Sequence, residues 1–235
     1  FSFKWNMGWM HDNLDFLREE PAHRKRHFDK AVFGMLYHYN ENFVLPLSHD
    51  EVVHLKRSLL GKMPGDDQQR LANLRLLLGY QWTFPGKQLL FMGGELGQAD
   101  EWSEDRQLDW PAADEESPGR RIQSWVRDLN RLYRDEPALW EADFDEAGFQ
   151  WVNCNDRDAS VLSFLRWAKS GARTLLVVIN FGPVPRSGYR VGVPVPGRWE
   201  EELNSDAAAY GGGSLGNGGG RESERQPADG FGQSL

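Results

Sequence analysis

The feature that most constrains the fold is a change of pattern a little past the middle of the 235-residue chain. Before it, short apolar strands alternate with helical segments, which predicts parallel strands joined by helical crossovers. From about Ala138 onward, short β-rich segments are separated by Asn-Asp, Gly or Pro turns. That spacing predicts a mainly antiparallel sandwich. We therefore expect an α/β part followed by an all-β part.

Apolar periodicity and turn residues give the expected elements of each part. Strands are expected at residues 3–6, 42–47 and 88–92, and helices after Gly8 to about residue 20, at about 27–39, from residue 66 or 67 to the Pro-Gly at 85–86, and at 118–135. In the all-β part, strands are expected at 149–153, 159–168, 173–180, 188–193 and 198–203. The glycine-rich tract 210–220 is either a flexible linker or a long loop between the last strands.

Composition excludes several classes of function. With 27 Lys and Arg against 35 Asp and Glu, the formal charge is −8, which disfavours binding to a nucleic-acid backbone. The longest apolar runs fall far short of the roughly 18 residues that suggest a membrane span. The single cysteine, Cys154, excludes an internal disulfide framework and favours a reducing, cytoplasmic compartment. The histidines have no metal-ligand spacing, and no cofactor fingerprint occurs, so we expect neither a metal nor a cofactor.

Aromatic residues are the unusual part of the composition, because ten of the residues are Trp. Tryptophan fills cores, and it also provides flat, partly hydrated surfaces that suit sugar rings. Trp9 and Met10 follow the first expected strand, and we regard them as candidate sugar-contacting residues. The alternative is that both side chains simply pack in the core.

Charged residues follow two of the expected strands. In parallel βα architectures, reactive residues lie at the carboxyl ends of strands. The strand at 42–47 leads to His49 and Asp50, and the strand at 88–92 leads through two glycines to Glu95. A carboxylate at such a position can face a developing positive charge, and the imidazole can donate to a sugar hydroxyl. Alternatively, Asp50 caps the following loop, and Glu95 accepts from nearby backbone N–H groups.

Several ordered motifs resemble the bacterial 1,4-α-glucan branching enzymes of the α-amylase superfamily. They include KWNMGWMHD at 4–12, ENFVLPLSHDEVVH at 41–54, FMGGE at 91–95 and LDW at 108–110. The resemblance implies that residues 1–136 hold the sixth, seventh and eighth strands of a (β/α)8 TIM barrel, and that 137–235 form the all-β C-terminal domain. We expect the chain to be a C-terminal fragment that also lacks the last β-strands of that domain.

The resemblance also implies a reaction, in which an α-1,4-glucan chain is cleaved and passed to a 6-hydroxyl with retention, as in glycogen biosynthesis. Asp50 then stabilises the oxocarbenium-like transition state, and His49 holds the sugar. From their positions after the strands, Trp9, Met10 and Glu95 are our candidates for substrate contacts. The nucleophile and the acid/base belong to the fourth and fifth barrel strands, which this sequence does not contain. We therefore expect the chain to be inactive without the N-terminal part of the same enzyme.

The sequence departs from the family pattern at Leu55, where glycine is usual, so the conformation of the loop after Asp50 stays open. Two other hypotheses also stay open. The first is another enzyme of the superfamily, a trehalose-releasing or debranching hydrolase. The second is a non-catalytic glucan-binding module that uses exposed Trp residues. Reaction products distinguish the first from a branching enzyme, and retardation in a glycogen gel tests the second.

Overall fold

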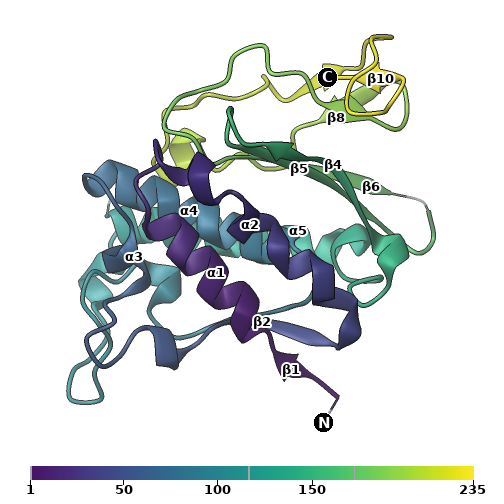
Figure 1. Cartoon of the computed structure of the whole chain (residues 1–235). Coiled ribbons are helices and arrows are strands. Elements are labelled where there is room, and N and C mark those ends of the chain that lie inside the picture. The colour runs from purple at the N-terminus through teal and green to yellow at the C-terminus, as the bar shows by residue number, and fades with distance from the viewer. Residues whose placement is uncertain (1, 116, 172) are drawn as a thin grey trace.

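The computed structural model describes residues 2–115, 117–171 and 173–235, and it has a layer of helices between two β-sheets (Figure 1). The first sheet contains β1 (Lys4–Trp5), β2 (Phe43–Leu47) and β3 (Lys87–Leu90), in the order β1-β2-β3. Both pairings are parallel, with Trp5 opposite Val44 and Leu47 opposite Leu90. The expected α/β pattern with parallel strands is therefore present in the first part of the chain.

The crossover between β1 and β2 begins with α1 (Met7–Arg18), whose first turn is capped by Asn6: its Oδ1 accepts the Trp9 N–H at 2.9 Å. The single helix expected at 27–39 is wrong in detail. The structure instead has the 3₁₀ turn η1 (Arg24–His27), a short α2 (Asp29–Phe33) and the 3₁₀ segment η2 (Gly34–Asn40). Gly34, which disfavours a continuous α-helix, marks the change from α2 to η2.

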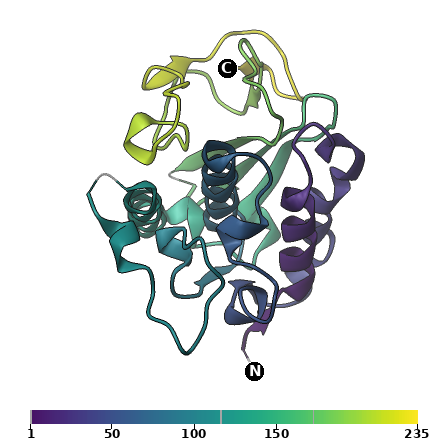
Figure 2. The same ribbon diagram turned by 90° about the vertical axis from the view of Figure 1, so that its left-hand side faces the viewer.

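The crossover between β2 and β3 contains α3 (Leu59–Lys62) and the long α4 (Asp67–Thr83). Asp66 and Gln69 form a reciprocal capping box that fixes where α4 begins, and the chain becomes extended at Phe84, before Pro85. After β3, α5 (Pro118–Asp135) starts at a proline behind the N-cap Ser117, as the sequence predicts. In Figure 2, α4 lies between α1 and α5.

The second part is β-rich and antiparallel, as expected. β4 (Phe149–Asp156), β5 (Val161–Trp167) and β6 (Thr174–Asn180) form one sheet in the order β4-β5-β6. Beyond them, β7 (Gly192–Val193) pairs with β10 (Gln233–Ser234), and β8 (Arg198–Glu200) pairs with β9 (Gly220–Glu222). The glycine-rich tract is therefore a long loop within the β8–β9 connection.

Short 3₁₀ turns complete the connections: η3 (His49–Glu51), η4 (Gly94–Leu96), η5 (Trp110–Ala113), η6 (Pro137–Leu139), η7 (Glu146–Gly148) and η8 (Ala208–Tyr210). Two of them follow strands of the first sheet: one residue separates β2 from η3, and three residues separate β3 from η4. They carry the charged residues that the sequence places at the ends of these strands.

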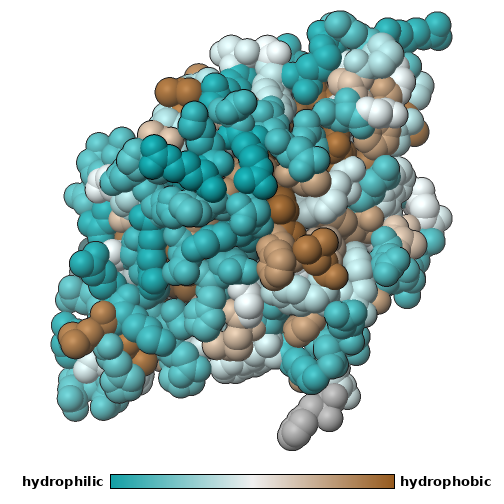
Figure 3. Space-filling model, viewed as in Figure 1, coloured by the Kyte–Doolittle hydropathy of each residue, from teal (hydrophilic) through white to brown (hydrophobic). Residues whose placement is uncertain are grey.

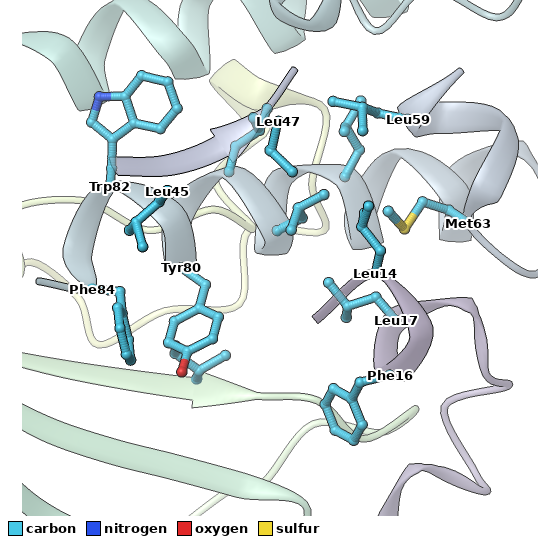
Figure 4. Close-up of a cluster of buried hydrophobic side chains, with 14 of the residues drawn as sticks. Leu14, Phe16, Leu17, Leu45, Leu47, Leu59, Met63, Tyr80, Trp82 and Phe84 are labelled. Carbon is cyan, nitrogen blue, oxygen red and sulfur yellow. The ribbon is translucent and has the colours of Figure 1, made fainter. Parts of the chain in front are cut away.

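One hydrophobic core joins the two parts of the chain. Figure 4 shows side chains from α1, α4 and β2 pointing into it, among them Leu14, Leu45 and Tyr80. The antiparallel sheet contributes Phe164, whose ring centroid lies 6.3 Å from that of Tyr80. The opposite face of the same sheet is covered by a smaller cluster around Leu165 and Val191. The antiparallel sheet is thus packed on both faces.

The surface in Figure 3 is mostly hydrophilic, with a small group of hydrophobic residues over α2. Phe33 and Leu36, at the junction of α2 and η2, are exposed. Among the described residues, no helix has the length and apolar character needed to cross a bilayer.

Candidate active site

The carboxyl ends of β2 and β3 lie side by side and form the base of the candidate site. The ladder continues one residue beyond β3, because the Phe91 N–H donates to the Leu47 carbonyl at 2.9 Å. After β2, the buried Ser48 precedes η3, which turns the next two side chains toward solvent. The side chain of His49 is 52 % exposed and that of Asp50 is 49 % exposed. Both are therefore accessible to a ligand at this edge of the sheet.

His49 lies between a carboxylate and an aromatic pair. Its Nε2 is 3.2 Å from Asp50 Oδ1, and its ring centroid is 5.8 Å from that of Phe91. The Phe91 ring in turn meets Trp102 edge to face, with centroids 5.4 Å apart. The imidazole thus has an anionic neighbour on one side and packed apolar rings on the other, which limits the directions in which it can point.

Glu51, the third residue of η3, is buried and connects the site to α1. Its Oε1 lies 3.3 Å from Lys56 Nζ and 3.7 Å from His11 Nε2. Burying a carboxylate is costly unless it has a hydrogen-bond partner, and Lys56 Nζ donates to Glu51 Oε1 here. Sequence reasoning assigned no role to Glu51, because a carboxylate next to Asp50 gives no sign of whether it faces solvent or the interior.

Glu95 lies on η4 and faces its own backbone. Its Oε2 accepts the Gly93 N–H at 2.9 Å, and Gly93 has φ +90°, a conformation that favours glycine. Glu95 is also one of the residues that line an open groove of about 440 Å³ along α5, together with Asn130 and Arg131. This geometry corresponds to the backbone-accepting alternative for Glu95.

Trp9 and Met10 are placed in the core by the inner face of α1. Trp9 is 1 % exposed and Met10 is 0 % exposed, and the Trp9 ring packs 6.1 Å from Phe84 and 6.2 Å from Tyr80. Neither side chain presents a surface that a sugar could touch in this structure. What they do here is pack α1 against α4, which fixes the start of the helix beside the site.

A recess beside the site, of about 20 Å³, is lined by Leu47, Val52, Phe91 and Trp102 among others. This volume holds about one water molecule and is too small for a sugar ring. The candidate site is therefore an open edge that carries His49 and Asp50. Among the residues that the structure describes, no three His, Cys, Asp or Glu side chains come together to hold a metal ion.

The loop that follows η3, residues 52–58, contains contacts that sequence reasoning missed. Glu101 accepts backbone N–H groups from Leu55 at 2.8 Å and from Arg57 at 2.7 Å. Lys62, buried on α3, donates to the carbonyls of Lys56 and Arg57. The one available signal was Leu55 itself, where the family pattern has glycine. It indicates an unusual backbone conformation without indicating what holds it.

The sequence of the chain is similar to a family of known protein domains and to several known enzymes. Residues 151–235 match the family described as "Alpha amylase, C-terminal all-beta domain". The whole chain is 57 % identical to the 1,4-alpha-glucan branching enzyme GlgB of Thiobacillus denitrificans and to that of Aromatoleum aromaticum, of which it covers 32 % and 37 %. It is 53 % identical to the enzyme of Pseudomonas fluorescens, of which it covers 31 %.

The fold also resembles a solved structure, the crystal structure of AmyP in complex with maltose. The TM-score is 0.57 at 15 % sequence identity, over 77 % of this chain and 40 % of that one. At this identity the similarity concerns the fold alone. The chain spans about a third of the length of the curated relatives that it matches. Over its whole length the chain is thus similar, at 53–57 % identity, to about a third of the length of these bacterial 1,4-alpha-glucan branching enzymes, and residues 151–235 match the alpha-amylase C-terminal domain.

Proposed function

We propose that β1, β2 and β3 are the sixth, seventh and eighth strands of a (β/α)8 barrel, and that residues 1–136 belong to the barrel and 137–235 to the C-terminal domain. Three parallel strands with helical crossovers support this assignment. Among the described residues, β1 and β3 each pair on one edge only, and Phe3 and Trp5 on or beside β1 are exposed. A closed barrel would pair both of these edges.

The proposed activity is the transfer of an α-1,4-glucan segment to a 6-hydroxyl, which forms an α-1,6 branch on glycogen or amylose. Asp50 would face the positive charge that develops on the sugar ring in the oxocarbenium-like transition state, and His49 would donate a hydrogen bond to the same sugar. An anion fixed beside such a charge in a site with little water contributes several kcal/mol. In this proposal Glu95 stabilises the turn at Gly93 next to the bound glucan, and the buried side chains of Trp9 and Met10 hold α1 in place.

The observation that carries the proposal is the position of the His49–Asp50 pair. Both side chains are about half exposed at the carboxyl edge of a parallel sheet, where barrel enzymes place their reactive groups. Retention also needs a nucleophile and an acid/base, and we expect both in the two thirds of the relatives' length that this chain does not span. The chain alone is therefore proposed to be inactive, its partner being the remaining part of the same enzyme, in the cytoplasm.

A chimera tests this function directly. The chain replaces the matching third of the Thiobacillus denitrificans enzyme, and the product formed from amylose is followed by iodine staining and by NMR counting of α-1,6 linkages. We expect branching by the chimera and none by the 235-residue chain alone. Release of trehalose or of linear chains without new α-1,6 linkages would instead assign the chain to a hydrolase of the superfamily.

A further inference from the structure

The loop that follows the His49–Asp50 pair has a strained backbone. The structure describes six non-glycine residues with positive φ, and three of them, His54 (57°), Leu55 (69°) and Arg57 (67°), are in the 52–58 loop. The left-handed region is unfavourable for residues with a Cβ, and leucine has no side-chain polar group to compensate locally. Leu55 is also 96 % exposed, so its own packing does not hold it in this conformation. Contacts from elsewhere must hold the loop.

Glu101 provides the most direct of these contacts. Its two carboxylate oxygens accept separate backbone N–H groups, Oε1 from Leu55 and Oε2 from Arg57. The two donors flank Lys56, so a single carboxylate binds two peptide N–H groups of the loop. These hydrogen bonds hold the pKa of the Glu101 carboxyl below its ordinary value, so the side chain is ionised at neutral pH.

The neighbouring Trp102 holds the other end of the loop. Its N–H donates to the Val52 carbonyl at 3.0 Å, two residues beyond Asp50. Its ring packs on Phe91, and Phe91 packs on His49. Residues 101 and 102 follow β3, whereas the loop follows β2. Hydrogen bonds therefore join the segment after β3 to the segment after β2, within a few residues of His49 and Asp50.

We propose that Glu101 is a positioning residue for the His49–Asp50 pair. Its ionised side chain holds the 52–58 loop in the left-handed conformation, and this fixes η3 and the direction of the Asp50 carboxylate. The inference rests on the proposed function for its catalytic consequence, because the reaction needs Asp50 at a defined place opposite the sugar. The effect of Glu101 on the conformation of the 52–58 loop does not depend on that function, and it can be measured in the 235-residue chain alone.

The conformational part is tested on the chain by NMR-detected hydrogen exchange. Glu101→Gln offers one oxygen and one NH₂, so it cannot accept from both amides. We expect the protection of the Leu55 and Arg57 amides to fall at least about tenfold, and the His49 and Asp50 signals to shift. Glu104→Gln, an exposed neighbour on the same segment, is the matched control and should change neither. Unchanged protection in Glu101→Gln would overturn the proposal.

The catalytic part is tested in the chimera with the Thiobacillus denitrificans enzyme. We expect Glu101→Gln to lower kcat about 10- to 100-fold with little change in KM for amylose, because the misplaced group acts on the transition state. Adding Leu55→Gly should recover much of kcat, since glycine adopts the left-handed conformation without the clamp. A general loss of folding would lower only the folded fraction of the chimera, which circular dichroism measures, and would leave kcat per folded enzyme unchanged.

The outcomes separate the two proposals. If the unmodified chimera branches amylose but Glu101→Gln keeps its kcat, the positioning role is wrong and the proposed function stands. If the unmodified chimera does not branch, the proposed function fails, and the amide exchange and the His49 and Asp50 signals in the chain alone decide whether Glu101 positions the loop.

Discussion

Arg166, on β5, is predicted to be the most sensitive single position for stability, because its guanidinium is completely buried where the two parts of the chain meet. Its Nη2 lies 2.7 Å from Asp143 Oδ1, and both side chains have zero exposure. Its remaining N–H groups donate to main-chain carbonyls: Nη1 to Thr83 at 2.7 Å, Nη2 to Leu139 at 3.2 Å and Nε to Gly148 at 3.3 Å.

Asp143 extends the same network to the parallel sheet. Its Oδ2 accepts from Lys87 Nζ at 2.7 Å and from the Tyr133 hydroxyl at 3.1 Å. Lys87 lies on β3, whose carboxyl end leads to the candidate site, and Tyr133 lies on α5. The network therefore joins β3, α5 and β5 around one buried carboxylate. Without Arg166, the buried Asp143 carboxylate would lose one of its two cationic partners, and three main-chain carbonyls would lose a hydrogen-bond donor.

We expect Arg166→Met to lower the free energy of unfolding by about 3–5 kcal/mol, the usual cost of breaking a buried pair on one side. With an m-value of roughly 2–3 kcal/mol/M, the urea midpoint would fall by about 1–2.5 M. Lys87→Met is the comparison: its side chain is 37 % exposed, and Asp143 keeps Arg166, so we expect a loss of only about 1 kcal/mol. The double variant Arg166→Met/Asp143→Leu should recover part of the loss, because no buried charge is left unpaired.

Urea unfolding followed by circular dichroism measures all three variants. A loss below about 1 kcal/mol for Arg166→Met, or a double variant less stable than the single one, would refute the reasoning.

Two further predictions concern the 52–58 loop. Leu55→Gly should raise the free energy of unfolding by about 1 kcal/mol, because glycine adopts the left-handed backbone conformation without strain and the exposed leucine side chain has no packing to lose. A drop in the thermal midpoint would contradict this. Lys62 gives a pH dependence: burial lowers its pKa to about 8 from 10.5, so between these values the unfolded chain holds a proton that the folded chain has released. Stability from this group therefore rises with pH in that window, and the advantage of the wild-type chain over Lys62→Met, measured by urea unfolding, should grow from about pH 7 to about pH 9.5. A constant or shrinking difference would count against the buried ammonium.

The elements with strong local signals were the ones that could be predicted. α5 begins and ends where expected, because Ser117 caps it and Pro118 fits its first turn, and the apolar period runs to its end. The prediction of a single helix in the region of α2 and η2 was wrong in detail. The 3₁₀-helix repeats every 3.0 residues and the α-helix every 3.6, and so few turns do not separate the two periods. Pairing between distant strands, such as β7 with β10, depends on tertiary packing and has no local signature.

In the candidate site, too, some positions could be predicted from the sequence and others depend on the tertiary fold. The exposed position of His49 and Asp50 follows from strand order, because residues after a parallel strand reach the carboxyl edge of the sheet. The depth of Trp9 depends on which face of α1 meets α4, and a short helix with apolar residues on several sides does not reveal this. Glu101 lies 46 residues beyond Leu55 in sequence, so only the fold brings them together.

The most direct test of the account is the turnover of Asp50→Asn in the branching chimera, with Asp158→Asn, an exposed carboxylate in the turn after β4, as the control. We expect Asp50→Asn to lower kcat by at least about 100-fold, because it neutralises an anion opposite a developing cation, and we expect the control to keep the activity of the unmodified chimera. A folded Asp50→Asn chimera that forms α-1,6 branches at a near-normal rate would show that Asp50 does not stabilise the transition state.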